Sequence, residues 1–331
     1  MKIALLLIII IFVLLSAIFF ASKPLTAGAK VLLLLSQEFP QVPIKPLHKI
    51  TQEPKTEKVR IEKKIIGDLL IPRGKNKMPA LIVAMGVKTS DKDRRVLLDF
   101  CETLSRLGYV VLWPRLEDLE KDVVKFEEPQ TFIDAFEYLE NLEFVDKKRI
   151  SYVGFSVGSS LTIVAAEDEK INSKVRSVVF FGGYYSILDY LTALSTKKVT
   201  LDGQTIKWNP HESAIDHAQE ILVKEGLWLD MLNKESSPDP TSTKRLLRFS
   251  PDQKINALKA NIFILHEKSD AFVPYTESIK LKKALEDEGK VLVYYQANLF
   301  EHVQPKKEMS YEIVMEFLGL FDFLHKVFMY L

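Results

Sequence analysis

The stretch Arg149-Ile-Ser-Tyr-Val-Gly-Phe-Ser-Val-Gly-Ser-Ser160 decides the fold predicted for this chain. Its apolar, β-branched start is typical of a buried strand that stops at Gly154, and the run 161–166 favours a helix. A strand that passes into a helix through Gly154-x-Ser156-x-Gly158 predicts a tight turn with an exposed serine hydroxyl, a nucleophile elbow. The two glycines remove Cβ atoms that would collide with the strand and the helix. A glycine-bounded turn with a surface serine is the alternative, so the rest of the chain has to supply partners for Ser156.

Buried strands alternate with helices along most of the chain. Apolar runs bounded by turn residues predict strands, and apolar residues three and four positions apart predict helices. The expected strands are 58–65, 67–72, 80–84, 109–113, 150–153, 175–181, 262–266 and 291–295, and the expected helices are 91–107, 130–141, 161–166, 276–285 and 307 onward. This order indicates a mostly parallel sheet covered by helices on both faces. Ligands bind such sheets at the carboxyl ends of the strands, so chemical residues are expected directly after strands.

A base and an acid are needed to activate the serine. The base takes the hydroxyl proton, and the acid orients the base. Of the six histidines, His302 is the one that follows the last predicted strand, and Asp270 follows the strand before it. The order Ser156, Asp270, His302 is that of α/β-hydrolases. Asp189, after an earlier strand, is the alternative acid, and capping a helix is the alternative role for Asp270.

Two backbone N–H groups are also expected beside the serine, because acyl transfer develops a negative charge on the substrate oxygen. One donor is expected from Val157, the residue after the nucleophile. The other is expected from Val87, in the loop after strand 80–84. The start of the helix behind Ser156 adds unpaired N–H groups and a partial positive charge.

These stretches together resemble the α/β-hydrolase superfamily, and within it the dienelactone hydrolase and prolyl oligopeptidase-like branch. The matching segments are 145–150 running into Gly154-Phe-Ser-Val-Gly158, Leu265-His-Glu-Lys-Ser-Asp270 with Val273-Pro274, and His302. The resemblance covers residues 57–331. It implies an α/β-hydrolase fold with a twisted, mostly parallel sheet, and a triad of Ser156, Asp270 and His302 that hydrolyses esters or related acyl bonds.

Three features depart from the family pattern. Narrow-sense dienelactone hydrolases have a cysteine nucleophile where this chain has Ser156, so lactone specificity does not carry over. Met85-Gly86 stands for the usual His-Gly, and Ser159 for the glycine after the elbow, so a reshaped oxyanion loop is expected. Glu267 replaces a glycine and places a charge near the acid loop.

The remaining composition gives no sign of other chemistry. The 45 basic and 44 acidic residues nearly cancel, which does not predict a nucleic-acid partner. The single cysteine, Cys101, excludes an intrachain disulfide and lies on the apolar face of a predicted helix. No Cys/His cluster has zinc spacing, and neither a cofactor nor a metal is implied.

The amino-terminal region is expected to be a membrane anchor. Residues 3–21 carry no charge and are about as long, as a helix, as the hydrocarbon core of a bilayer. An uncleaved anchor over residues 1–22 is favoured over a cleaved signal, although Ala27-Gly-Ala29 leaves cleavage open. Lysines on both sides leave the orientation open. Residues 23–56, with four prolines after residue 39, are expected to be a tether, with a helical turn near the membrane at 31–35.

A long segment between two predicted strands is expected to form a cap. About 78 residues separate the strand that ends near Gly183 from the one that starts at Ile262, more than a crossover requires. A helix is predicted over 214–233 and a hairpin around Asp202-Gly203, and the cap is placed at about 184–250. Its large aromatic residues line either an apolar pocket or the core of the cap: Tyr184, Tyr185, Trp208 and Trp228.

The sequence therefore predicts a membrane-anchored serine hydrolase with a small-molecule acyl substrate, acting through an acyl-enzyme. An acyltransferase or a peptidase with the same triad is an alternative. A second alternative is an inactive α/β-hydrolase scaffold whose cap binds a protein partner. No residue is assigned to substrate binding.

Overall fold

A computed structural model describes residues 22–40, 42–62, 65–74, 77–86, 91–115, 128–224, 240–286, 288, 290, 292–306 and 313–331. The predicted membrane segment 3–21, Val87 and Trp228 lie outside these ranges. Within them, no helix combines the length and the apolar character needed to cross a bilayer.

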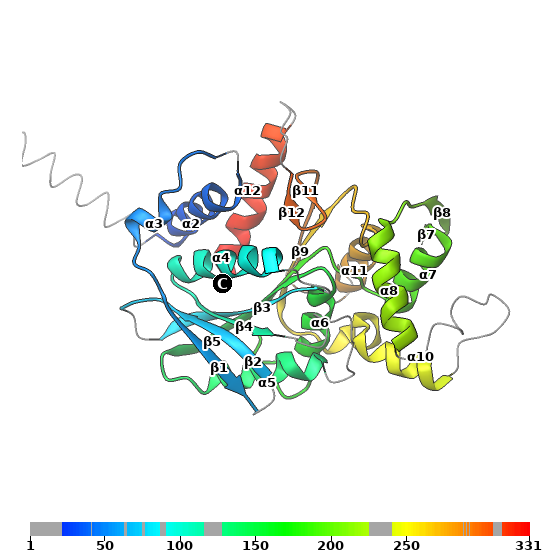
Figure 1. Cartoon of the computed structure of the whole chain (residues 1–331), viewed down its shortest axis with the longest axis horizontal. Coiled ribbons are helices and arrows are strands. Elements are labelled where there is room, and N and C mark those ends of the chain that lie inside the picture. The colour runs from blue at the N-terminus through cyan, green and yellow to red at the C-terminus, as the bar shows by residue number, and fades with distance from the viewer. Residues whose placement is uncertain are drawn as a thin grey trace, which may run out of the picture.

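A sheet of eight strands lies at the centre of the described part of the chain, in the order β1-β2-β4-β3-β5-β6-β9-β10 (Figure 1). The strands are β1 (Lys55–Ile61), β2 (Ile65–Ile71), β3 (Met78–Ala84), β4 (Val110–Arg115), β5 (Val145–Phe155), β6 (Ser177–Phe181), β9 (Asn261–Glu267) and β10 (Leu292–Ala297). β1 and β2 pair antiparallel, as do β2 and β4. The other pairs are parallel, which confirms the predicted mostly parallel sheet.

Helices cover both faces of this sheet. α5 (Glu128–Glu140), α6 (Val157–Ala166) and α11 (Thr276–Glu286) share one apolar core with the sheet. α2 (Lys23–Glu38), α4 (Asp91–Arg106) and α12 (Ile313–Tyr330) share the other, and lie together above the sheet in Figure 1. Successive strand side chains alternate between the two cores: on β3, Ile82 packs in the first, whereas Leu81 and Val83 pack in the second. Cys101 is buried in the second core, as its helical spacing predicts.

The segment expected to be a tether instead contains two helices, α2 and α3 (Leu47–Ile50), and α2 packs against α12. α2 docks because its apolar residues recur at helical spacing and form a stripe along one face. Val31 and Leu34 of this stripe are buried in the core. The end of α2 is fixed by Lys45, whose Nζ donates hydrogen bonds of 2.6–3.0 Å to the carbonyls of Ser36, Gln37 and Phe39. Residues 23–50 are thus attached to the sheet domain and do not extend away from it.

The insertion between β6 and β9 forms a subdomain with its own small core. It contains α7 (Ile187–Thr196), the hairpin β7 (Lys198–Leu201) and β8 (Gln204–Lys207), α8 (Glu212–Lys224) and α10 (Pro240–Leu246). Asp202 and Gly203 both have positive φ, 51° and 76°, as a two-residue hairpin turn requires, which confirms the predicted hairpin. Tyr184 and Tyr190 stack in this core, which also contains Val273 from the loop after β9. The cap therefore packs directly on that loop.

We expect Val31→Ala to lower the free energy of unfolding by about 2 kcal/mol, because Val31 is fully buried and its two methyl groups would leave a void between α2 and the sheet. Guanidinium unfolding of the full chain measures this. Leu32→Ala is the control: Leu32 is 62% exposed on the same helix, and its loss should change stability by less than about 0.5 kcal/mol. Equal, small effects of both substitutions would contradict the docking of α2.

The end of α6 predicts a pH-dependent stability. Glu167 is buried, and its Oε1 has no hydrogen-bond partner in the described structure. Burial, together with Asp252 nearby, raises the pKa of Glu167 to about 9. The unfolded chain ionises this group near its ordinary pKa of about 4.3, so the folded state binds the extra proton between these values and stability falls as pH rises through that window.

We therefore expect Glu167→Gln to gain stability over the natural chain as the pH rises from 5 to 9, by at most about 1.4 kcal/mol per pH unit. Guanidinium unfolding at pH 5, 7 and 9 tests this. Glu169→Gln, at an exposed position two residues along, should follow the natural chain throughout. If the free energy of unfolding of Glu167→Gln varied with pH in parallel with that of the natural chain, the prediction would be contradicted.

Candidate active site

The turn between β5 and α6 has the geometry expected from its glycines. Ser156 has φ 55° and ψ −137° and stands immediately before the first residue of α6. A Cβ on Gly154 would lie 2.3 Å from Cα of Ser159, and one on Gly158 would lie 2.5 Å from the carbonyl oxygen of Met85. Neither position has room for a side chain, so the serine is held in a strained conformation by packing on both sides.

Ser159, which replaces the usual glycine after the elbow, has a local structural role. Its Oγ lies 2.8 Å from the carbonyl oxygen of Ser156 and donates a hydrogen bond of 2.9 Å to the carbonyl of Phe181. The backbone N–H of Ser156 donates to the same Phe181 carbonyl over 2.8 Å. The Ser159 hydroxyl thus adds a second bond between the start of α6 and the end of β6.

The loop after β3 passes close to the serine. A Cβ on Gly86 would lie 3.0 Å from the hydroxyl oxygen of Ser156 and 3.4 Å from the backbone nitrogen of Val157. The amide of Val157 therefore lies next to this loop, at the amino end of α6, where N–H groups lack helical partners. Val87, the second predicted donor, follows Gly86 in the chain but lies outside the described residues.

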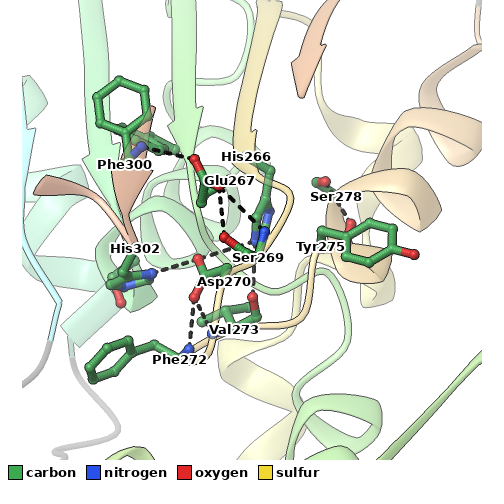
Figure 2. Close-up of polar contacts among 12 residues, drawn as sticks. His266, Glu267, Ser269, Asp270, Phe272, Val273, Tyr275, Ser278, Phe300 and His302 are labelled. Atoms are coloured by element: carbon green, nitrogen blue, oxygen red, sulfur yellow. Dashed lines mark hydrogen bonds and ion pairs between the residues drawn. The ribbon is translucent and has the colours of Figure 1, made fainter. Parts of the chain in front are cut away.

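The buried Asp270 and the half-buried His302 form an acid–base pair (Figure 2). Nδ1 of His302 lies 2.6 Å from Oδ2 of Asp270, and Oδ1 of Asp270 accepts hydrogen bonds from the backbone N–H groups of Phe272 (2.7 Å) and Val273 (3.0 Å). Burial by itself would raise the pKa of Asp270, but His302 and His266 and their hydrogen bonds hold it well below its ordinary value. The ionised carboxylate can only accept, so Nδ1 of His302 carries a proton and Nε2 is left as the basic nitrogen.

A two-residue segment, Phe181-Gly182, links this pair to the elbow. The carbonyl of Phe181 accepts the N–H of Ser156, whereas a Cβ on Gly182 would lie 3.4 Å from Cε1 of His302 and 3.5 Å from Oδ2 of Asp270. The described structure has no hydrogen bond between the Ser156 hydroxyl and His302. Catalytic hydrogen bonds commonly tighten only when substrate is bound.

A second histidine flanks the acid. His266 is fully buried at the end of β9, with Nε2 3.0 Å from the carbonyl of Val273 and 3.4 Å from Oδ2 of Asp270. A carbonyl only accepts, so Nε2 of His266 carries the proton and points toward the acid loop. Figure 2 shows the Asp270 carboxyl between the two imidazole rings.

Glu267 clamps the hairpin that carries His302, a role that the sequence did not reveal. β11 (Phe300–Glu301) and β12 (Gln304–Pro305) form this hairpin, with His302 at its turn in a left-handed conformation of φ 57°. The fully buried Glu267 accepts the N–H of Phe300 (2.9 Å), and its other oxygen binds the hydroxyl of Ser269 (2.9 Å) and Nζ of Lys306 (3.3 Å). One carboxylate thereby joins the acid loop to both ends of the histidine hairpin.

The cap also contacts the acid–base pair. The ring of Phe272 stacks between the imidazole rings of His302 and of His211 in the cap, and its centroid lies 5.0 Å from the centroid of each. The indole N–H of Trp208 donates to the carbonyl of Asp270 (2.9 Å), and the backbone N–H of His211 donates to the carbonyl of Ala271 (2.7 Å). Sequence reasoning gave His211 no role, because nothing local to the insertion shows that it meets the acid loop.

The alternative carboxylates lie elsewhere. Asp189 is in the first turn of α7 and forms an ion pair of 2.6 Å with Lys280. Glu301 is exposed, although it adjoins His302 in the chain. Within the described ranges, Asp270 is thus the carboxylate that contacts His302.

The comparisons with known proteins identify the fold. By sequence, the chain matches no family model and no curated protein. By structure, it is similar to esterase B from Lactobacillus rhamnosis, with 17% identity over 84% of this chain and 88% of that one and a TM-score of 0.53. A Klebsiella pneumoniae protein described as a dienelactone hydrolase gives 12% identity, 82% and 99% coverage, and a TM-score of 0.51.

An acylaminoacyl peptidase from Pyrococcus horikoshii is similar as well, with 16% identity over 85% of this chain and a TM-score of 0.52. The chain spans 41% of that peptidase, so the likeness concerns one part of it. These neighbours share the α/β-hydrolase fold, and the sheet order and the strand–turn–helix around Ser156 agree with it. The chain therefore has the α/β-hydrolase fold that its sequence predicts.

We expect Glu267→Ala to lower the free energy of unfolding by about 3 kcal/mol, because it leaves the buried Phe300 N–H without its acceptor and removes the carboxylate that Ser269 and Lys306 contact. Glu267→Gln should cost only about 1 kcal/mol, since its amide oxygen still accepts the Phe300 N–H. Guanidinium unfolding at pH 7 measures both. Glu301→Ala, exposed on the same hairpin, should be neutral within about 0.5 kcal/mol. If Glu267→Ala were as stable as Glu301→Ala, the contacts of Glu267 with the histidine hairpin would not stabilise the fold.

Proposed function

We propose that the protein is a serine hydrolase that cleaves a carboxylic ester or a related acyl bond. The observation that supports the proposal is the Asp270–His302 hydrogen bond of 2.6 Å, packed against Gly182. Gly182 follows Phe181, whose carbonyl accepts the backbone N–H of Ser156 on its strained turn. A histidine oriented by an ionised carboxylate next to such a serine is the arrangement that activates a hydroxyl nucleophile.

In the proposed reaction, Oγ of Ser156 attacks the acyl carbonyl carbon while its proton passes to Nε2 of His302. The Asp270 carboxylate stabilises the resulting imidazolium through Nδ1. The amides of Val157 and Val87 donate to the substrate oxygen as it becomes negative. The leaving alcohol takes the proton from His302, and an acyl-enzyme remains. Water then repeats the sequence, releasing the acid and the free serine.

The loops that bear these residues are supported from behind, which favours a working site. Glu267 fixes the hairpin of His302, and the Phe272 and Val273 amides fix the carboxylate of Asp270. Catalytic groups need such support to be held in a productive geometry. Peptide hydrolysis and acyl transfer to another acceptor use the same residues and are separated from ester hydrolysis by the products they form.

We also propose that residues 3–21 anchor the protein in a membrane. The proposal rests on the sequence: this segment lacks charge and is as long as a bilayer-spanning helix. It ends two residues before α2 begins at Lys23, so the anchor would hold the face bearing α2, α4 and α12 near the lipid.

We expect a fluorophosphonate probe to label the natural chain, because it reacts with a serine whose hydroxyl is activated by a neighbouring base. Ser156→Ala should abolish the label, read by mass spectrometry of the labelled peptide. Ser195→Ala, at an exposed serine on α7, should leave it unchanged. A natural chain that takes no label would favour the inactive scaffold, and a Ser156→Ala variant that is still labelled would rule out Ser156 as the nucleophile.

A further inference from the structure

An apolar cavity of about 180 Å³, partly open to solvent, lies between the sheet and the three helices α2, α4 and α12. Among the side chains that line it, Glu38 and Gln304 are the polar ones, and the rest are aliphatic, aromatic or Met. Protein interiors are packed closely enough that voids larger than a water molecule are few. A dry engineered cavity of about 150 Å³ already admits a benzene ring, so a volume of about 180 Å³ has room for an apolar group of about six carbons or more.

One end of the cavity reaches the candidate active site. Four of its lining residues are immediate chain neighbours of residues described there: Met85 precedes Gly86, Phe155 precedes Ser156, Phe181 precedes Gly182 and Val303 follows His302. The Ser156 hydroxyl lies against Gly86. An apolar chain in this end of the cavity would therefore bring the group attached to it close to the serine.

The other end lies at the opposite edge of the sheet. α12 lines the cavity from Leu320 to Phe328, which corresponds to about 12 Å along a helix axis, and Leu331 lines it just beyond the helix. Near its end, the ring of Phe328 lies 6.0 Å from that of Tyr109, the residue that precedes β4 at the amino edge of the parallel strands. The lining thus runs from the carboxyl edge, where the serine lies, to the amino edge, and an elongated apolar group fits it better than a compact one.

Glu38 is compatible with such an occupant. It lines the cavity at the carboxyl end of α2, and burial raises its pKa to about 7, against the opposing effects of Thr103 and Lys45. Below that pH the group is neutral, so the cavity then carries no charge in its wall.

We propose that this cavity binds the acyl chain of the substrate, so that the ester cleaved is one of a straight-chain carboxylic acid of at least six carbons. The proposal rests on the proposed function, because the carbonyl group of such a chain would meet Ser156. The chain would run beneath α4 and α12, on the sheet face opposite α6, and α2 would form part of its outer wall.

The first test is the rate of hydrolysis of p-nitrophenyl esters of two to ten carbons by the full chain in phospholipid nanodiscs, because detergent tails would compete for the cavity. Each buried methylene should raise kcat/KM up to about fourfold, so the eight-carbon ester should exceed the four-carbon ester on the order of 100-fold. A flat or falling dependence on chain length would overturn the proposal.

Two substitutions at the far end should shift this preference in opposite directions. Val327→Trp fills the cavity, and the ratio of kcat/KM for the eight-carbon to the four-carbon ester should fall at least tenfold. Phe328→Ala lengthens the cavity, and the best substrate should become longer than in the natural chain. Leu318→Trp, 59% exposed on the same helix and outside the cavity, should change neither. General damage to the fold would lower all rates together, so an unchanged preference in both variants would overturn the proposal.

Binding separates this inference from the proposed function. Decanoate should bind the Ser156→Ala chain in calorimetry, and Ser156→Ala with Val327→Trp should bind it at least tenfold more weakly. Esterase activity without chain-length preference and without decanoate binding would overturn the cavity's role and leave the hydrolase proposal intact. Decanoate binding that depends on Val327, in a chain that hydrolyses no ester, would support the ligand class and overturn the proposed function.

Discussion

The buried negative charge of Asp270 is the constraint on which the site depends. A carboxylate that is 3% exposed is stable only if its oxygens are satisfied, and here the donors come from two loops. Phe272 and Val273 supply backbone N–H groups from its own loop, and His302 supplies Nδ1 from the hairpin after β10. Satisfying this one charge therefore brings together the two loops that the proposed chemistry requires.

Glu267 extends the same arrangement one residue into β9. It stands where the family that this sequence resembles has a glycine. Its carboxylate accepts hydrogen bonds from Phe300 of the histidine hairpin and from Ser269 of the acid loop. The cap adds contacts from the other side, through the indole of Trp208 and the ring stack on Phe272. The geometry of His302 thus depends on the sheet, its own hairpin and the insertion together, and substitutions in any of them should affect it.

The two faces of the sheet have different roles in the proposed function. The face under α5, α6 and α11 forms an apolar core that supports the elbow, with buried aromatic side chains such as Phe136 and Tyr152 in ring contact. The face under α2, α4 and α12 contains the apolar cavity, and its outer wall includes a helix that follows the predicted membrane segment. A protein held at a membrane by that segment would meet its apolar substrates where they are concentrated.

The sequence by itself determined the alternation of strands and helices, the elbow around Ser156, and the order in which Asp270 and His302 follow it. These features are local, since each rests on the spacing of apolar residues or on glycines beside a turn. Only the tertiary structure decided that α2 packs on α12. The same holds for the hydrogen bonds between Glu267 and Phe300, which are 33 residues apart, and between Trp208 and Asp270, which are 62 residues apart. The physical reason is that periodicity shows which face of an element is apolar but not which distant surface covers it, and a cavity exists only where several such surfaces fail to meet.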